Sequence, residues 1–297
     1  MNRETETILT GTHLNKSFGK HDAVCNLDLV LEPDTIYGLF GRNGAGKTTL
    51  LDMLTGSSFP GSGEITVSGK RLHMGDTPRD ICYVRERNLF IRNAKIMEIL
   101  EVASAYHKYW DWAFAHELVK IFKLNPNKKI SQLSRGMESM VGNLIGLASR
   151  APITLFDEPV LGLDVLMREK FYRLLADDCA KYPRTVLLST HLIDEIAEVV
   201  EKVYVMEAGS ILLHDEADNI RNQSHVIRGD REAVLAFKEG KRVIHQESDG
   251  NNDLLAAIYD KIGDADRAKA AEQGISITGL PLQKFFAYLI EEGDRVG

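Results

Sequence analysis

The sequence has no apolar stretch long enough to cross a membrane. Its uncharged segments do not extend much beyond about a dozen residues, whereas a transmembrane helix needs roughly 20 apolar ones. The first residues, MNRETETILTG, lack the apolar region and the small-residue cleavage site of a secretory signal. We therefore expect a cytoplasmic protein that does not itself span the bilayer.

Cysteine and positive charge are both scarce. Cys25, Cys82 and Cys179 are odd in number and widely spaced, which excludes a disulfide framework and the spacing of a zinc site. We interpret all three as small apolar groups in the core. The chain has 36 lysines and arginines against 43 aspartates and glutamates, and its net charge of −7 gives no general attraction for nucleic acid or anionic lipid.

What the chain does contain is typical of a globular α/β protein. Hydrophobic residues make up 44% of its 297 residues and charged residues 27%, which contradicts a disordered or low-complexity chain. The length exceeds that of a usual single domain, so we expect one large domain and a smaller appendage. Short runs rich in β-branched residues predict strands at residues 24–31, 36–40, 64–67, 81–84, 153–156, 185–189 and 202–206.

Helical periodicity appears in the middle of the chain. Apolar residues between Arg92 and Ser149 follow helical spacing, which predicts a helical subdomain at about residues 88–150, inserted into the core. Predicted helices at 165–181 and 192–200 alternate with the late strands, as in a mostly parallel sheet covered by helices.

The pattern weakens after His214, and we expect a domain of residues 1–214 followed by an accessory α+β domain of residues 215–297. The accessory domain is predicted to have strands at 225–228 and 242–246 and helices at 232–239 and beyond. The acidic segment 249–253 is interpreted as a solvated loop.

A phosphate-binding loop is predicted at residues 41–48. It lies between a predicted strand and a helix-competent run, the context that this motif (Walker A) requires. Its glycines allow backbone N–H groups to point at a phosphate, while Lys47 reaches the β- and γ-phosphates and Thr48 binds magnesium. A simple glycine-rich turn is the alternative. The predicted nucleotide-binding residues here are Gly41, Arg42, Asn43, Gly44, Ala45, Gly46, Lys47, Thr48 and Thr49.

Two adjacent carboxylates, Asp157 and Glu158, end the predicted strand 153–156. Ligands of parallel sheets collect at the carboxyl ends of the strands. Asp157 is suited to holding magnesium through water, and Glu158 to polarising the water that attacks the γ-phosphate. A surface acidic pair is the alternative for these residues alone, but the preceding loop favours ATP and Mg²⁺ as cofactors.

Three further motifs complete a recognisable set: LSRGM at 133–137, PVLGLD at 159–164 and STH at 189–191. In this order, they resemble those of ATP-binding cassette (ABC) ATPases over about residues 7–214. The resemblance implies a P-loop NTPase core and two cassettes that hold two ATP molecules head to tail. It also implies that Lys47, Glu158 and His191 are catalytic.

The same resemblance assigns roles outside the phosphate-binding loop. It places Ser134 and Gly136 on the γ-phosphate held by the other subunit, Asp164 at the dimer interface, His191 on the γ-phosphate and Phe18 on adenine. Simpler alternatives are a helix N-cap for Ser134, a capping or core role for His191 and a core position for Phe18.

Two departures from the family pattern stand out. Glu86 replaces the usual glutamine, and SRGM at 134–137 replaces the usual SGGQ. Glu86 remains a possible magnesium ligand, but its charge adds to those of Asp157, Glu158 and the triphosphate unless magnesium, Arg85 or Arg87 compensates. Such departures resemble exporter ATPases associated with antimicrobial-peptide resistance or self-protection.

The leading hypothesis is an ATP-hydrolysing subunit that powers an ABC transporter by head-to-tail dimerisation. Its expected partners are a second cassette, in a homodimer, and a separate permease that holds it at the inner face of the membrane. The aromatic patch at 106–114 is interpreted as subdomain packing, with contact to a permease as the alternative. Alternatives for the whole chain are a soluble cassette ATPase acting on nucleic acid or the ribosome, and a low-turnover ATP sensor. No nucleic acid is expected, because the chain is acidic and lacks coiled coils, zinc modules and a second cassette.

Overall fold

The computed structural model describes residues 7–248 and 252–296, with side chains up to Glu291 at the C-terminal end. These residues form two compact units. The first takes in the chain up to His191 together with residues 199–213, and the second takes in residues 192–198 and the chain from His214 onward.

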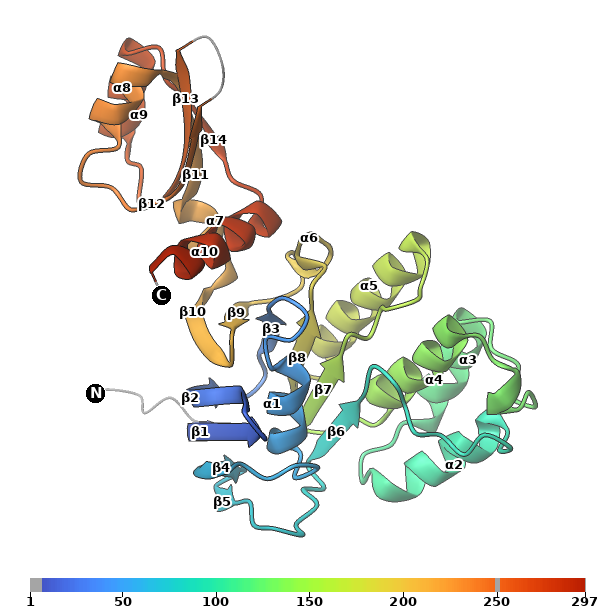
Figure 1. Cartoon of the computed structure of the whole chain (residues 1–297). Coiled ribbons are helices and arrows are strands. Elements are labelled where there is room, and N and C mark those ends of the chain that lie inside the picture. The colour runs from blue at the N-terminus through green and yellow to red at the C-terminus, as the bar shows by residue number, and fades with distance from the viewer. Residues whose placement is uncertain (1–6, 249–251, 297) are drawn as a thin grey trace, which may run out of the picture. The chain divides into compact units, whose positions relative to one another are not determined.

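The first unit is built on a six-stranded sheet with the order β10-β9-β3-β8-β7-β6 (Figure 1). Strand β3 pairs in parallel with β8 and β9, and β7 pairs in parallel with β6 and β8. This confirms the predicted α/β class and mostly parallel sheet. The strands are β3 Ile36–Phe40, β6 Ile81–Val84, β7 Ile153–Asp157, β8 Thr185–Thr190, β9 Lys202–Glu207 and β10 Ser210–Glu216.

A second sheet in this unit is antiparallel and has the order β2-β1-β4-β5. The runs at 24–31 and 64–67 belong to it and not to the parallel sheet. Strand β1 was not predicted, because polar residues interrupt it and its register with β2 shifts several times, so it has no continuous apolar run. The strands are β1 Leu9–Phe18, β2 His21–Leu31, β4 Ser62–Val67 and β5 Lys70–Arg71.

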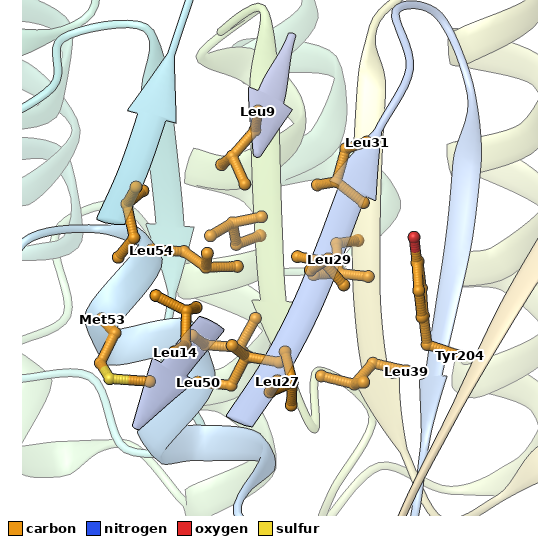
Figure 2. Close-up of a cluster of buried hydrophobic side chains, with 14 of the residues drawn as sticks. Leu9, Leu14, Leu27, Leu29, Leu31, Leu39, Leu50, Met53, Leu54 and Tyr204 are labelled. Carbon is orange, nitrogen blue, oxygen red and sulfur yellow. The ribbon is translucent and has the colours of Figure 1, made fainter. Parts of the chain in front are cut away.

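Helix α1, Lys47–Leu54, is buried among residues of both sheets. Figure 2 shows its apolar side chains meeting those of β1, β2 and the parallel sheet in one cluster. Tyr204 also links the sheets, because its hydroxyl donates to the carbonyl of Val30 at 2.7 Å and accepts from the same residue's N–H at 3.1 Å. The labelled members of the cluster are Leu9, Leu14, Leu27, Leu29, Leu31, Leu39, Leu50, Met53, Leu54 and Tyr204.

Between β6 and β7 the chain forms a helical region, as the periodicity predicts. Its elements are α2 Ile96–Tyr106, α3 Trp112–Ile121, the 3₁₀ turn η1 Ile130–Gln132 and α4 Arg135–Ala148. Trp110 and Trp112 pack edge to face at 5.5 Å between ring centroids, whereas Tyr106 and Tyr109 are exposed. Helix α5, Val165–Lys181, has the predicted bounds.

The second unit has a β-α-β-β-α-β core with antiparallel strands in the order β12-β13-β11-β14. This is the ferredoxin-like arrangement. Its strands and helices are α6 Ile193–Ile196, α7 Ala217–Gln223, β11 Ser224–Asp230, α8 Arg231–Phe237, β12 Val243–Ser248, β13 Asp253–Tyr259, α9 Asp264–Glu272, β14 Ser276–Gly279 and α10 Leu282–Val296.

Three local predictions need correction or limitation. The helix expected at 192–200 is reduced to α6, whose four residues end at Ile196. Cys25 is half-buried and not a core residue, although Cys82 and Cys179 are buried. In the segment interpreted as a solvated loop, strand β13 begins at Asp253, and residues 249–251 lie outside the described part of the chain.

The burial of α1 leads to a prediction about the free energy of unfolding. Leu50 is fully buried in the cluster, so Leu50→Ala should lower the free energy of unfolding by about 2–5 kcal/mol through lost apolar contact and a residual cavity. Leu166, on α5, is 77% exposed, and Leu166→Ala should change the free energy of unfolding by no more than about 0.5 kcal/mol. Urea unfolding of both variants measures the difference, and equal effects would contradict the described packing.

Candidate nucleotide-binding site

A cavity of about 360 Å³ lies at the carboxyl ends of β3 and β7. This is the edge at which parallel sheets bind their ligands. The cavity brings together residues from the first 50 positions with three acidic residues: Glu86 after β6, Asp157 at the end of β7 and Glu158 after it. Its lining residues are Phe18, His21, Ala23, Asn43, Gly44, Gly46, Lys47, Thr48, Thr49, Glu86, Asp157 and Glu158.

The phosphate-binding loop, residues 41–48, depends on glycine at two positions with positive φ. Gly44 has φ 88° and Gly46 has φ 102°, a region that other residues rarely adopt. A Cβ at Gly46 would lie 2.2 Å from the carbonyl oxygen of Ala23, whereas one at Gly44 would meet no atom within 4 Å. Gly46 is therefore required by a close backbone contact with β2 as well as by its conformation.

Lys47 begins helix α1 and is buried at the base of the loop. Its ammonium group donates to the carbonyls of Gly41 at 2.8 Å and Arg42 at 3.2 Å, and lies 3.8 Å from a carboxylate oxygen of Glu158. The first N–H groups of a helix have no partners within the helix. Together with the lysine, these groups give the loop the donors that a phosphate needs.

Asp157 is buried and accepts hydrogen bonds at both carboxylate oxygens. Thr48 donates to Oδ2 at 2.8 Å, and Ser189 at the end of β8 donates to Oδ1 at 2.5 Å. Threonine and aspartate oxygens are ligands that Mg²⁺ accepts, and this ion usually completes its shell with water and phosphate oxygens. Among the residues that the structure describes, no three His, Cys, Asp or Glu side chains form a metal-binding group.

Glu158 is held in an unusual backbone conformation, with φ 47° in the left-handed region. Residues in such conformations cluster at functional sites, where the surrounding structure holds them. The N–H of Glu158 donates to the carbonyl of Ser189 at 3.1 Å, and its Oε2 lies 3.0 Å from Nδ1 of His191. Its Oε1 is buried and accepts no hydrogen bond in the described structure. This oxygen is the one that lies 3.8 Å from the ammonium group of Lys47.

Phe18 ends strand β1 at the mouth of the cavity and is 56% exposed. The core alternative for this residue is therefore wrong. The ammonium group of Lys16 lies 5.4 Å from the centre of the ring. An exposed aromatic ring beside a phosphate-binding loop is suited to stacking on a purine base.

Glu86 also lines the cavity, and no ion pair in the described part of the chain joins it to Arg85 or Arg87. Arg85 pairs with Asp52 at 2.7 Å and lies over the ring of Tyr83. Glu86 instead accepts a hydrogen bond at 2.6 Å from Arg135, the first residue of helix α4.

Burial raises the pKa of Tyr83, and the nearby charge of Asp157 raises it further, so this phenol remains neutral.

The remaining predicted residues do not line this cavity. Ser134 caps α4 by accepting a hydrogen bond from Met137 N–H at 3.3 Å, and Asp164 caps α5 by accepting from Met167 N–H at 2.9 Å. Gly136 packs so tightly that a Cβ would lie 2.5 Å from the carbonyl oxygen of Gly162. Within one chain, the signature segment, residues 133–137, is thus separate from the phosphate-binding loop.

Sequence reasoning missed three contributors to the site. His21 and Ala23 of β2 line the cavity, and Ser189 anchors Asp157. Ser189 carried a signal, because it opens the STH motif at a strand end. No motif marks His21 or Ala23, since only the pairing of β2 beside the loop brings them there.

The fold and the cavity define a P-loop ATPase. A family profile described as "ABC transporter" matches residues 24–161. The "Putative ABC transporter ATP-binding protein AlbC" of Bacillus subtilis is 33% identical over 57% of this chain and 75% of the relative. The chain belongs to the ABC transporter family, and it is an ATP-binding subunit and an ATPase of that family.

Other similarities extend this comparison. The "Bacitracin transport ATP-binding protein BcrA" of Bacillus licheniformis is 24% identical over 97% of this chain and 98% of its own length. A dimeric ATP-binding cassette solved in a post-hydrolysis state with ADP and Pi superposes with a TM-score of 0.63, at 23% identity, over 70% of this chain and 98% of that chain. At this level of identity the solved structure supports the fold alone. In the described residues, no helix combines the length and apolarity needed to cross a bilayer.

The two loop glycines provide a matched test of the cavity. Gly46→Ala places a methyl group against the backbone of Ala23 in a conformation that costs about 1–2 kcal/mol, so ATP binding should fall more than about tenfold below that of Gly44→Ala. Gly44→Ala carries the conformational cost without the clash. Titration of both full-length variants with a fluorescent ATP analogue measures this, and equal affinities would contradict the described loop.

Proposed function

We propose that two copies of this chain close head to tail around two ATP molecules, and that this closure drives a membrane permease. The set of residues that lines the cavity carries the proposal. One chain supplies the phosphate-binding loop and the acidic pair Asp157 and Glu158, but its Ser134 and Gly136 do not line the cavity. A second chain would complete the site by presenting its helix α4, whose N-terminus is suited to an anion.

Hydrolysis would use side chains of the phosphate-binding loop, the acidic pair Asp157 and Glu158, and His191 after β8. Lys47 would hold the β- and γ-phosphates, and Thr48 and Asp157 would hold Mg²⁺, which neutralises phosphate charge when bound. Glu158 would accept the proton of the attacking water through its carboxylate. His191, whose Nδ1 lies 3.0 Å from Oε2, would orient the Glu158 carboxylate and face the γ-phosphate.

The proposed domains are close to the two compact units, except that residues 192–198 belong to the second unit. We propose that residues 1–214 form the catalytic cassette and residues 215–297 an accessory domain. Since a relative that this chain matches over 98% of the relative's length is named for bacitracin transport, a peptide antibiotic is the cargo class that the comparisons favour. The permease would be a separate chain that holds this one at the inner face of the membrane.

Replacing the proposed base tests the chemistry. Glu158→Gln keeps the shape of the side chain but loses the basic oxygen, so ATP should bind while hydrolysis slows by about a hundredfold or more. Glu169→Gln, on an exposed position of α5, is the matched control and should hydrolyse ATP at the wild-type rate. Phosphate release by the purified chain measures both. Wild-type turnover of Glu158→Gln would remove Glu158 from this role.

Mixing two inactive variants tests the composite site. Ser134→Arg should prevent ATP-induced dimerisation while leaving the ATP affinity of the monomer nearly unchanged, and Lys47→Ala should lose phosphate binding. In a mixed dimer both lesions fall in one site, so the other site keeps an intact loop and an intact signature segment. Mixed dimers should therefore form with ATP. If they do not, while each parent behaves as described, head-to-tail pairing is wrong.

A further inference from the structure

We infer that Arg135 and Glu86 form one functional unit, in which Arg135 neutralises the Glu86 carboxylate in the nucleotide cavity of its own chain and so allows a triphosphate to bind there. The inference rests on the proposed function, since it assumes that ATP occupies the cavity. It assigns Arg135 as a positioning residue that acts through Glu86. The two departures from the family pattern then compensate each other.

The geometry links two neighbouring cavities. Glu86 lines the nucleotide cavity and also a second cavity of about 340 Å³, which Arg135 lines as well. An Nη of Arg135 lies 2.6 Å from Oε1 of Glu86, the length of a strong charge-assisted hydrogen bond. The guanidinium group therefore reaches the carboxylate from outside the nucleotide cavity and leaves the space inside it to the ligand.

The charges around the cavity explain why this pair is needed. Three carboxylates line it, from Glu86, Asp157 and Glu158, and Lys47 is the single lysine or arginine among the described lining residues. A triphosphate brings further negative charge into the same space. Asp157 already has two hydrogen-bond donors and Glu158 has Lys47 and His191 nearby, so Glu86 is the carboxylate whose compensation depends on Arg135.

Two other basic side chains near the pair are engaged elsewhere, and no described ion pair joins the third, Arg87, to Glu86. Arg85 pairs with Asp52, and Arg92 pairs with Glu138 on the next turn of α4. The side chains of Arg135 and Glu86 are 52% and 35% exposed, and ion pairs this exposed contribute little to folding stability. The loss of Arg135 should therefore appear in nucleotide affinity and not in stability. Magnesium would supply an alternative partner for the site, so the effect should be largest without it.

The test measures the affinity of the full chain for ATP at low ionic strength, with EDTA or with Mg²⁺, at a concentration where the wild type is monomeric. Arg135→Ala should weaken Mg²⁺-free ATP binding about five- to tenfold, because an uncompensated carboxylate then faces the phosphates. Arg135→Lys should retain most of the affinity. Adding Glu86→Gln to Arg135→Ala should restore it to within about twofold of that of Glu86→Gln alone.

Arg92→Ala is the matched control, because it breaks an ion pair with Glu138, another residue of α4, and neither partner lines the nucleotide cavity. It should leave ATP affinity unchanged. Unchanged affinity of Arg135→Ala would overturn the inference, and so would a loss that Glu86→Gln fails to rescue, since Arg135 would then act on phosphate itself. If the wild type does not bind ATP, the proposed function fails instead, which is a separate result.

Discussion

The burial of helix α1 is the constraint on which the catalytic unit depends. Apolar residues of both sheets surround this helix, so its first turn cannot move without opening the core. The phosphate-binding loop is fixed at both ends, by strand β3 before it and by α1 after it. Gly46 lies against the backbone of β2, and Ala45 accepts a hydrogen bond from Gly209 N–H after β9. A rigid loop keeps its donors oriented before the phosphate arrives, so little ordering is needed on binding.

The fold also gives the two residues of the acidic pair different surroundings. Asp157 and Glu158 follow one another along the chain but have different environments. Asp157 is satisfied at both oxygens, whereas Glu158 has a left-handed backbone and one buried oxygen without a hydrogen bond. Adjacent carboxylates can thus take different tasks, one holding an ion and the other accepting a proton.

Local features of the sequence were sufficient to predict the core of this site. The phosphate-binding loop and the acidic pair carry their chemistry in consecutive residues, and buried parallel strands appear as apolar runs. Strand β1 was not predicted because its polar residues and bulges interrupt the alternation of apolar and polar residues. Helix α6 ends early although its sequence favours a longer helix. The ion pair between Glu86 and Arg135 was also not predicted, because the two residues lie 49 positions apart and only the tertiary structure brings them together.

One chain is proposed to hold half of each ATP site, and sedimentation of Glu158→Gln with MgATP measures this arrangement. Slow hydrolysis should leave ATP trapped, so Glu158→Gln should sediment as a dimer containing two ATP molecules with MgATP and as a monomer with ADP. A chain that binds ATP to saturation and remains a monomer at micromolar concentration would contradict the composite site.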